Sequence, residues 1–589
     1  MYQKITAFLL VALFTTSTFA QAPIAKTPTE AEAKLQKDAV EFLRDTSVEV
    51  DRLRLPENRI SFNSELASLM WFHDEKAGRE MYTDAIADFK QLMVQLDAQL
   101  NAPAEDEDPG FLGGMFGSYG KSKAERKLTI AVAVRQQIAS SLAEHAPDLA
   151  YSFFYDSSTL ISNQKFREMM ASSDKWFESQ LLAQIARSDP AKAVQYGKAS
   201  IKDGVDTSHI SLLRTLYAKD PDKAAELGDA ILSKLKSDKE KNAWITNQLL
   251  ELGDEILEAS KKADKKPIYS QSELREIAEL YVQTLTDQNM DSYGEAMMNI
   301  TLIEKYAPGR AAQLRSRQRT HAVSNSYATN SVRGLSTNAN KSYSVSNTYD
   351  ASNSNVAMLE YEAQQRDRDA QNKAELDLYK GITEFGSKPL GKEERSKLVA
   401  STRSAIAKTR GKDKKVLALS LLAAQVAKSG DRELAGDLMR DAERLVDPQP
   451  KNYQDFLLSW MLASGYAQTE PEKAFPILDG AIARANGTIA AAAKIAEFID
   501  VNDDYVTDGE AQVGIFGGTM VRTITGELSG ANVTLRALAK ADFGKTAALA
   551  NAFDRPEIRV LARMLVLRAL LEKDKPIAQD RDVDVDVLN

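Results

Sequence analysis

Apolar residues recur three and four positions apart in segment after segment of this 589-residue chain, and this spacing constrains the fold more than any other feature. Two such sets are Leu249, Leu252 and Ile256, and Leu274, Ile277 and Tyr281. Residues at this spacing lie on one face of an α-helix, where they pack against a neighbouring element. Strand-like alternation is almost absent. The sequence therefore predicts an all-α protein.

Prolines mark the corners between the predicted helices. Asp189-Pro190 and Asp220-Pro221 each follow an apolar helical segment. An Asp side chain caps the first turn of a helix, and proline fits the first helical position, where no N–H is needed. Similar corners occur at Pro147, Pro308 and Pro471. The first three corners are 43 and 31 residues apart, a range typical of two-helix repeats without a fixed period. We expect an irregular α-solenoid of helical hairpins.

A change in composition divides the chain into two arrays. From Ser324 to Ser354, 18 of the 31 residues are Ser, Thr or Asn. Such a tract buries too little apolar surface to offset the entropy of ordering it, so residues 316–354 are predicted to be a linker. Helical-repeat arrays are expected at 21–315 and 355–573.

Several local signals refine the C-terminal array. A stripe of Val416, Leu419, Ala423 and Val426 predicts one helix, and Tyr453, Leu457, Trp460 and Ser464 predict another. Gly430-Asp431 is expected to end one helix and cap the next, and Asn486-Gly487 to end a later one.

Two glycine-rich apolar loops, at 111–117 and 514–518, interrupt the helical pattern. Residues 520–525 alternate beyond a Gly-Gly pair, which predicts one small β-hairpin near 511–526. The last residues, 574–589, are expected to form a disordered acidic tail.

Residues 1–20 have the order of a secretory signal peptide. Lys4 lies in a short polar start, an apolar run extends from Ile5 to Phe14, and a tract of small residues ends at Ala20. The apolar run is shorter than the ~20 residues that span a bilayer. We therefore expect an exported protein, periplasmic or secreted, without a transmembrane anchor.

The amino-acid composition argues against some kinds of stabilisation and some partners. The chain has no cysteine, so an exported form must be stable by burial alone, without disulfides. The formal net charge of −9 is modest and its signs are interspersed, which argues against nucleic acid as a partner.

No set of residues completes a catalytic, cofactor-binding or metal-binding motif, so we predict no such site and no cofactor. Gly120-Lys121-Ser122 ends like a phosphate loop, but Met115 replaces the first glycine. Residues 500–504 have the oxygen spacing of a calcium loop, but Tyr505 replaces its glycine and Ala511 its closing Glu.

Other candidate residues also have simpler interpretations. The four histidines, His73, His145, His209 and His321, lack the spacing of zinc ligands. Glu178-Ser179 is the dipeptide of lytic transglycosylases without their Gly-Leu-Met-Gln signature, so Glu178 is expected to be a solvent-facing helix carboxylate. The four tryptophans, Trp71, Trp176, Trp244 and Trp460, are expected to pack between helices.

Segments near both ends have a familiar pattern. Leu55-Pro56-Glu57-Asn58-Arg59-Ile60 resembles the first helical hairpin of uncharacterised exported α-helical-repeat (tetratricopeptide-like) proteins of soil bacteria. Residues 553–559, Phe-Asp-Arg-Pro-Glu-Ile-Arg, resemble the start of their closing helix. The resemblance implies the helical architecture and carries no activity.

These observations favour a non-catalytic exported scaffold that binds another polypeptide on a curved helical surface. The loops at 111–120 and 514–518 are the expected contact regions, unless they pack on their own helices. The alternative is a hydrolase that acts on cell-envelope or extracellular polymers through acidic residues on separate helices. A deep cleft with two facing carboxylates of raised pKa would favour the hydrolase.

Overall fold

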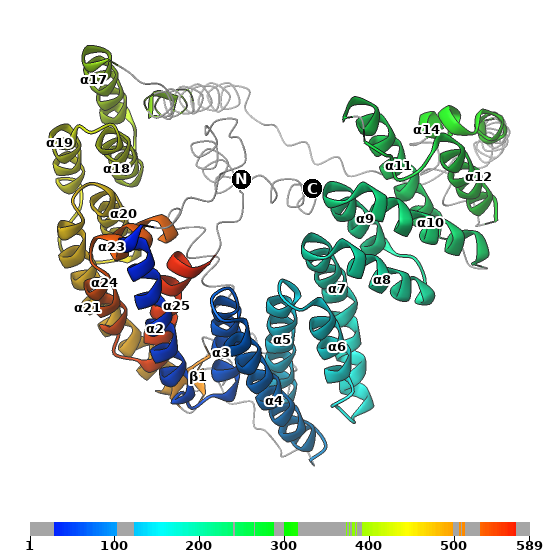
Figure 1. The fold of residues 1–589 in the computed structure, drawn as a ribbon, viewed down its shortest axis with the longest axis horizontal. Coiled ribbons are helices and arrows are strands. Elements are labelled where there is room, and N and C mark those ends of the chain that lie inside the picture. The colour runs from blue at the N-terminus through cyan, green and yellow to red at the C-terminus, as the bar shows by residue number, and fades with distance from the viewer. Residues whose placement is uncertain are drawn as a thin grey trace, which may run out of the picture. The chain divides into compact units, whose positions relative to one another are not determined.

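The computed structural model describes residues 29–102, 123–238, 242–263, 265–287, 300–315, 391–498, 506–507, 509–512 and 531–572, with a few positions between 373 and 385. The predicted signal peptide, the predicted linker at 316–354 and the acidic tail lie outside these residues, as do both glycine-rich loops and the candidate phosphate and calcium loops. The described chain is mostly helical with one two-stranded antiparallel sheet, which confirms the predicted fold class (Figure 1). None of its helices combines the length and apolar character needed to cross a bilayer.

The chain forms two compact units. Unit 1 comprises Met1–Gln137 and Thr348–Asn589, and unit 2 comprises Ile138–Asn347. This division differs from the expected arrays at 21–315 and 355–573, because it falls inside helix α5 (Lys123–Ala143) and groups the N-terminal helices with the C-terminal ones.

Unit 2 is a run of stacked helical hairpins. Its helices are α6 (Pro147–Ser158), α7 (Gln164–Ser188), α8 (Pro190–Ser200), the 3₁₀ turn η1 (Ile201–Asp203), α9 (Thr207–Lys219), α10 (Pro221–Ser237), α11 (Ala243–Ala263), α12 (Gln271–Asp287) and α14 (Ile300–Tyr306). Most of them pack against the next helix, and several contact the next but one: α7 contacts α8 and α9, and α9 contacts α10 and α11. This neighbour pattern is that of a helical-repeat array.

The corners of unit 2 form as the sequence predicts. Asp189 Oδ1 accepts a hydrogen bond from Lys192 N at 3.0 Å, and Asp220 Oδ1 accepts from Asp222 N and Lys223 N at 3.1 Å each. Pro190 and Pro221 occupy the first positions of α8 and α10. The capping carboxylates satisfy N–H groups that a helix start leaves without partners.

Unit 1 contains the remaining elements. They are α2 (Glu30–Asp51), α3 (Pro56–Trp71), α4 (Glu75–Leu100), α17 (Lys392–Lys408), α18 (Lys412–Lys428), α19 (Arg432–Glu443), α20 (Tyr453–Thr469), α21 (Pro471–Phe498), β1 (Val506–Thr507), β2 (Glu510–Ala511), α23 (Ala531–Ala541), α24 (Phe543–Asn551) and α25 (Pro556–Leu571). Gly430 has φ 92° and Asp431 caps α19 by accepting from Leu434 N at 3.2 Å, so that predicted corner is confirmed.

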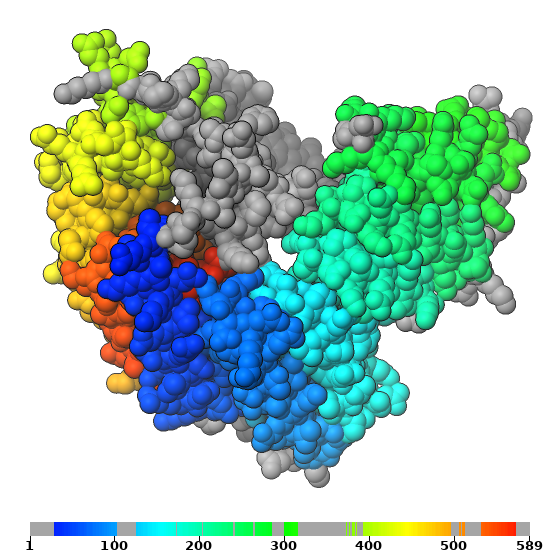
Figure 2. All heavy atoms as spheres, in the orientation of Figure 1, coloured from blue at the N-terminus to red at the C-terminus, as the bar shows by residue number. Residues whose placement is uncertain are grey.

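Helices from both ends of the chain share one hydrophobic core. Leu43 of α2 and Leu66 of α3 are buried in the same cluster as Val560, Met564 and Leu567 of α25. In Figure 2 the N-terminal helices, in blue, lie against the C-terminal helices, in orange and red. This shared core explains why the compact units do not follow the order of the sequence.

The β-hairpin lies slightly ahead of its predicted range. Val506 pairs with Ala511 and Thr507 with Glu510, and Gly509 has a φ of 72° in the turn. Only Ala511 is common to this strand pair and the predicted range 511–526, in which residues 513–526 are outside the described chain.

Helix α21 does not end at Asn486-Gly487 as expected. The helix continues to Phe498, because the Asn486 side chain binds a turn of the C-terminal segment instead of ending its own helix. Asn486 Nδ2 donates to Ala552 O at 2.8 Å, and its Oδ1 accepts from Asp554 N at 3.2 Å.

Two tryptophans do not pack as expected. The side chains of Trp176 on α7 and Trp244 on α11 are 65% and 48% exposed. The buried stripe of α7 passes through Phe177, Leu181 and Ile185. Trp176 comes one residue before Phe177, so its side chain projects from a different face of the helix than the buried stripe.

Candidate functional site

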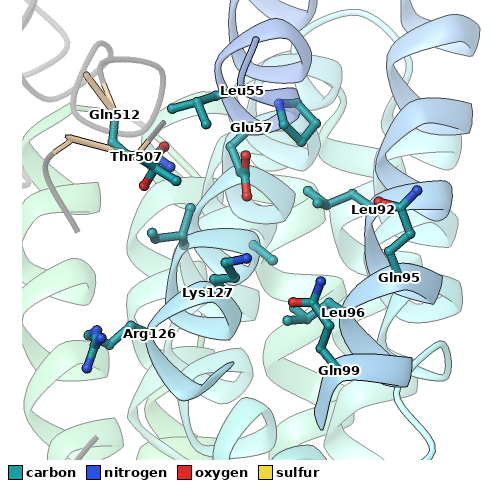
Figure 3. A pocket seen from close by; sticks show the side chains of 13 residues that line it. Leu55, Glu57, Leu92, Gln95, Leu96, Gln99, Arg126, Lys127, Thr507 and Gln512 are labelled. Carbon is teal, nitrogen blue, oxygen red and sulfur yellow. The ribbon is translucent and has the colours of Figure 1, made fainter. Parts of the chain in front are cut away.

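A small pocket lies within unit 1 where α3, α4 and α5 meet the β-hairpin (Figure 3). Its volume is about 140 Å³. The lining residues are Leu55, Pro56, Glu57, Leu92, Gln95, Leu96, Gln99, Arg126, Lys127, Ile130, Ala131, Thr507 and Gln512. Cavities of this size in proteins hold molecules as large as benzene.

Glu510 of β2 holds the start of α3 beside this pocket. Leu55 precedes the first turn of α3 and offers no capping side chain. The buried Glu510 carboxylate accepts from Arg54 N at 2.6 Å, from Leu55 N at 3.3 Å and from Asn58 Nδ2 at 2.7 Å. A carboxylate at this place also interacts favourably with the helix dipole.

The same turn occurs again before α25. Pro556, Glu557 and Arg559 stand 500 positions after Pro56, Glu57 and Arg59. The two arginines donate to equivalent carbonyls: Arg59 to Leu53 O and Arg54 O at 2.8 and 2.9 Å, and Arg559 to Phe553 O and Asp554 O at 3.0 Å each. Both glutamates are buried. We call these segments the Pro-Glu-x-Arg turns.

The β-hairpin bridges the two Pro-Glu-x-Arg turns. Glu510 binds the first turn, as described above. Glu557 Oε1 of the second turn accepts from Ala511 N at 3.2 Å and from Arg555 Nε at 2.5 Å, while Arg555 Nη2 donates to Gly509 O at 2.7 Å. Hydrogen bonds to both turns therefore fix the hairpin, which carries the pocket residues Thr507 and Gln512.

The pocket is lined by both acidic and basic side chains. The Glu57 carboxylate points toward Lys127 of α5, Arg126 lies farther along the same helix, and Gln512 lies beside Thr507 on the hairpin (Figure 3). Burial raises the pKa of Glu57; Lys127 and Arg59 oppose this rise, and Glu510 adds to it. The Gln512 side chain is buried, and its Oε1 has no hydrogen-bond partner in the described structure.

Glu57→Gln is expected to gain stability relative to the wild type as the pH rises. A carboxyl group whose pKa is raised by folding destabilises the fold only where it is ionised. The difference should be small below the ordinary pKa of 4.5, should grow as the pH rises from there through the higher folded-state value, and should level off above it. Thermal melting of both proteins between about pH 4 and about pH 8 measures this difference. A difference that stays constant across this range would contradict the assignment.

Sequence reasoning identified part of this site. Glu57 was expected only as a residue of a helix start, in a segment that resembles a family motif. Gln512 and Lys127 belong to no motif, and only folding brings them to one pocket. The sequence contains one signal that could have located the site. The Pro-Glu-x-Arg pattern occurs twice, and it marks the two turns that the hairpin joins.

Three tyrosines form a second candidate surface, on unit 2. The rings of Tyr151 and Tyr196 are stacked, with centroids 3.9 Å apart and an interplanar angle of 8°, and Tyr155 lies 4.7 Å from Tyr151. Tyr155 is 40% exposed. We call Tyr151, Tyr155 and Tyr196 the tyrosine surface.

Carboxylates fix the hydroxyls of the tyrosine surface. Tyr196 donates to Asp148, which also pairs with Lys192 at 2.9 Å. Tyr155 donates to Glu178, so this glutamate is a partner of an aromatic hydroxyl rather than the simple solvent-facing residue that was expected. Burial raises the pKa values of Tyr155 and Tyr196, and the accepting carboxylates raise them further. Both hydroxyls therefore stay protonated as donors.

Two of the described histidines, His209 and His73, make polar contacts within the fold. His209 is buried and contacts Asp206 at 2.9 Å within the cap of α9, and His73 lies 3.0 Å from Gln36 Nε2. His321 is outside the described chain. Among the described residues, no group of three or more His, Asp or Glu side chains has the geometry of a metal site.

Comparisons with protein-family models, curated proteins and solved structures found no match for this chain. Inference about function therefore depends on the surfaces described above.

Proposed function

We propose that this protein is an exported, non-catalytic helical-repeat scaffold that binds another polypeptide. The observation that carries the proposal is the tyrosine surface, where three rings on two helices are held in place while Tyr155 remains partly exposed. Tyrosines supply a large, rigid contact area at a low cost in conformational entropy.

The repeat architecture supports this proposal. Stacked hairpins offer an extended surface on which a polypeptide contacts several helices at once. The tyrosine surface draws side chains from α6 and α8 and is supported by Glu178 of α7. The exposed Trp176 and Trp244 add apolar area on α7 and α11 of the same unit. The exported location rests on the order of residues 1–20.

The alternative, a hydrolase of extracellular polymers, has one observation in its favour. Glu57 is buried, has a raised pKa and lines a pocket. Glycoside hydrolysis, however, uses a pair of carboxylates on either side of the scissile bond. The neighbouring carboxylate of Glu510 is bound by three donors of the α3 turn. The scaffold is therefore the better supported function.

Photo-crosslinking tests the scaffold proposal. A photoreactive amino acid at Ser152, which is exposed on α6 beside Tyr151 and Tyr155, is expected to capture a discrete polypeptide in the native host. The same probe at Lys262, exposed at the end of α11, serves as the control position. Absence of any polypeptide adduct at 152, together with turnover of an extracellular polymer by the purified protein, would reverse the assignment to the hydrolase.

Tyr155→Ala is expected to weaken binding of the captured partner by about 30-fold, because truncation of a central aromatic contact typically costs ~2 kcal/mol. Tyr155→Phe keeps the ring and loses only the hydroxyl, so its effect should be several-fold smaller. Titration of the purified partner measures both dissociation constants, with circular dichroism melting as the check on folding. Equal effects of the two variants would show that the hydroxyl, and not the ring, makes the contact.

A further inference from the structure

The turn between α17 and α18 concentrates positive charge on unit 1 (Figure 1). Residues 408–415 contain five bases and one acid, a net charge of +4, and no other eight-residue stretch of the sequence has as high a positive charge. The bases are Lys408, Arg410, Lys412, Lys414 and Lys415, and the acid is Asp413. The whole chain has a net charge of −9, so the sign is reversed locally. We call residues 408–415 the basic turn.

Three of the five bases of this turn keep their full charge. Lys408, Arg410 and Lys412 are exposed, and Lys414 and Lys415 are half-buried. Lys408, Lys412 and Lys415 form no ion pair with any residue that the structure describes. Their ammonium groups are therefore available to an anion outside the chain.

The neighbouring helix α19 does not neutralise the basic turn. Its Asp441 pairs with Arg403 of α17 and with Arg444 at 3.2 Å, and its Asp437 pairs with Arg440. Arg403 lies five residues before the basic turn, so Asp441 is at the same end of the helices. One carboxylate between two guanidinium groups leaves additional positive charge beside the turn.

The lysines at the start of α18 do not stabilise that helix. Gly411 precedes its first turn with a φ of 98° and supplies no capping side chain. Lys412, Lys414 and Lys415 follow, although cations are unfavourable near the positive end of a helix dipole. Only Asp413 has the favoured sign. Local charges that oppose folding are expected where they serve binding, and an external anion is the partner that fits them.

We propose that the basic turn binds the surface of a membrane that contains acidic phospholipids. Four of its five bases are lysines, whose ammonium groups act as point charges, whereas recognition of a single carboxylate or phosphate group favours the planar fork of arginine. A bilayer presents many phosphates in one plane, so several exposed bases interact with it at once without a shaped pocket. This surface belongs to unit 1 and goes beyond the binding of a polypeptide by the tyrosine surface of unit 2.

Vesicle sedimentation of the full-length protein tests the proposal. The protein should sediment with phosphatidylcholine vesicles that contain about 30% phosphatidylglycerol, and it should stay in solution with vesicles of phosphatidylcholine alone. Raising the salt concentration from about 0.1 M to about 0.5 M should release it, because salt screens exposed charges. Failure to sediment with the acidic vesicles at about 0.1 M salt would overturn the proposal.

Two pairs of substitutions with the same change in net charge locate the contact. Lys408→Gln combined with Lys412→Gln should weaken vesicle binding by about 25-fold, since each base near an acidic surface contributes roughly 5-fold. Lys37→Gln combined with Lys90→Gln removes two exposed bases of α2 and α4 and should change binding by less than about 2-fold. Circular dichroism melting checks that both variants fold. Equal weakening by the two pairs would show that overall charge governs binding and would overturn the role of the turn.

Poly-L-glutamate distinguishes a lipid surface from an acidic polypeptide. Vesicle binding that poly-L-glutamate does not displace at an equal concentration of negative charge supports the membrane as the occupant. If the protein binds poly-L-glutamate through Lys408 and Lys412 but does not sediment with the acidic vesicles, the occupant is an acidic chain and the membrane proposal is wrong.

Discussion

Glu510→Ala is expected to lower the free energy of unfolding of unit 1 by about 3 kcal/mol. The substitution removes a buried carboxylate that accepts from two backbone N–H groups and from the Asn58 amide. The N–H of the buried Leu55 would lose this acceptor, Asn58 Nδ2 would keep only its bond to Ala511 O, and the start of α3 would lose the negative charge near its N-terminus. Urea unfolding followed by circular dichroism measures the change.

Two matched variants isolate the role of Glu510. Glu510→Gln keeps one acceptor oxygen and should lose clearly less stability than the alanine variant. Glu80→Ala removes an exposed carboxylate that forms a 3.8 Å ion pair with Lys76, and it should change the stability by less than about 0.5 kcal/mol. If Glu510→Ala unfolds at the same urea concentration as Glu80→Ala, the hairpin does not hold the two turns together.

Gly78→Ala is expected to destabilise unit 1 by about 2 kcal/mol. A Cβ atom at this position in α4 would lie 2.8 Å from Trp71 Cα and 2.9 Å from Trp71 N. These are backbone atoms of the α3 terminus, so no side-chain rotation relieves the overlap, and the two helices must separate. Thermal melting measures the loss.

Gly480→Ala is the matched control for Gly78→Ala. Gly480 also lies within a helix of unit 1, but a Cβ at this position meets no atom within 4 Å. This substitution should raise the stability by about 0.5–1 kcal/mol, because alanine loses less backbone entropy than glycine on helix formation. Destabilisation by both variants to the same extent would contradict the close approach of α3 and α4.

Hydrophobic periodicity predicted where helices occur. It identified the buried face correctly in some helices and wrongly in others. The stripe Val416, Leu419, Ala423 and Val426 of α18 is buried throughout. In α20 the predicted stripe began at Tyr453, which is 64% exposed, while Leu458, Leu462 and Tyr466 are buried. Apolar residues occur on most sides of α20, so the spacing alone does not choose between its faces.

Tertiary contacts of the candidate sites were not predictable from one sequence. The pocket brings together residues from α3, α4, α5 and the hairpin, and Glu510 lies 456 positions from Arg54, whose N–H it binds. The residues of the tyrosine surface lie closer together in the chain, on neighbouring helices, but no pattern in the sequence predicts the surface. The sequence pattern did not show that Asp148 and Glu178 would bind the tyrosine hydroxyls, because partners on separate helices depend on the rotation of each helix.

The core shared by α2, α3 and α25 also sets an order for folding. Unit 2 is continuous in sequence, and its helices contact near neighbours, so it needs only short loops to be closed. The core of α2 and α3 is incomplete until α25 has been synthesised and has reached them. The apolar faces of α2 and α3 that α25 covers therefore stay exposed until that helix reaches them, which makes the first hairpin prone to aggregation in a chain that has not finished folding.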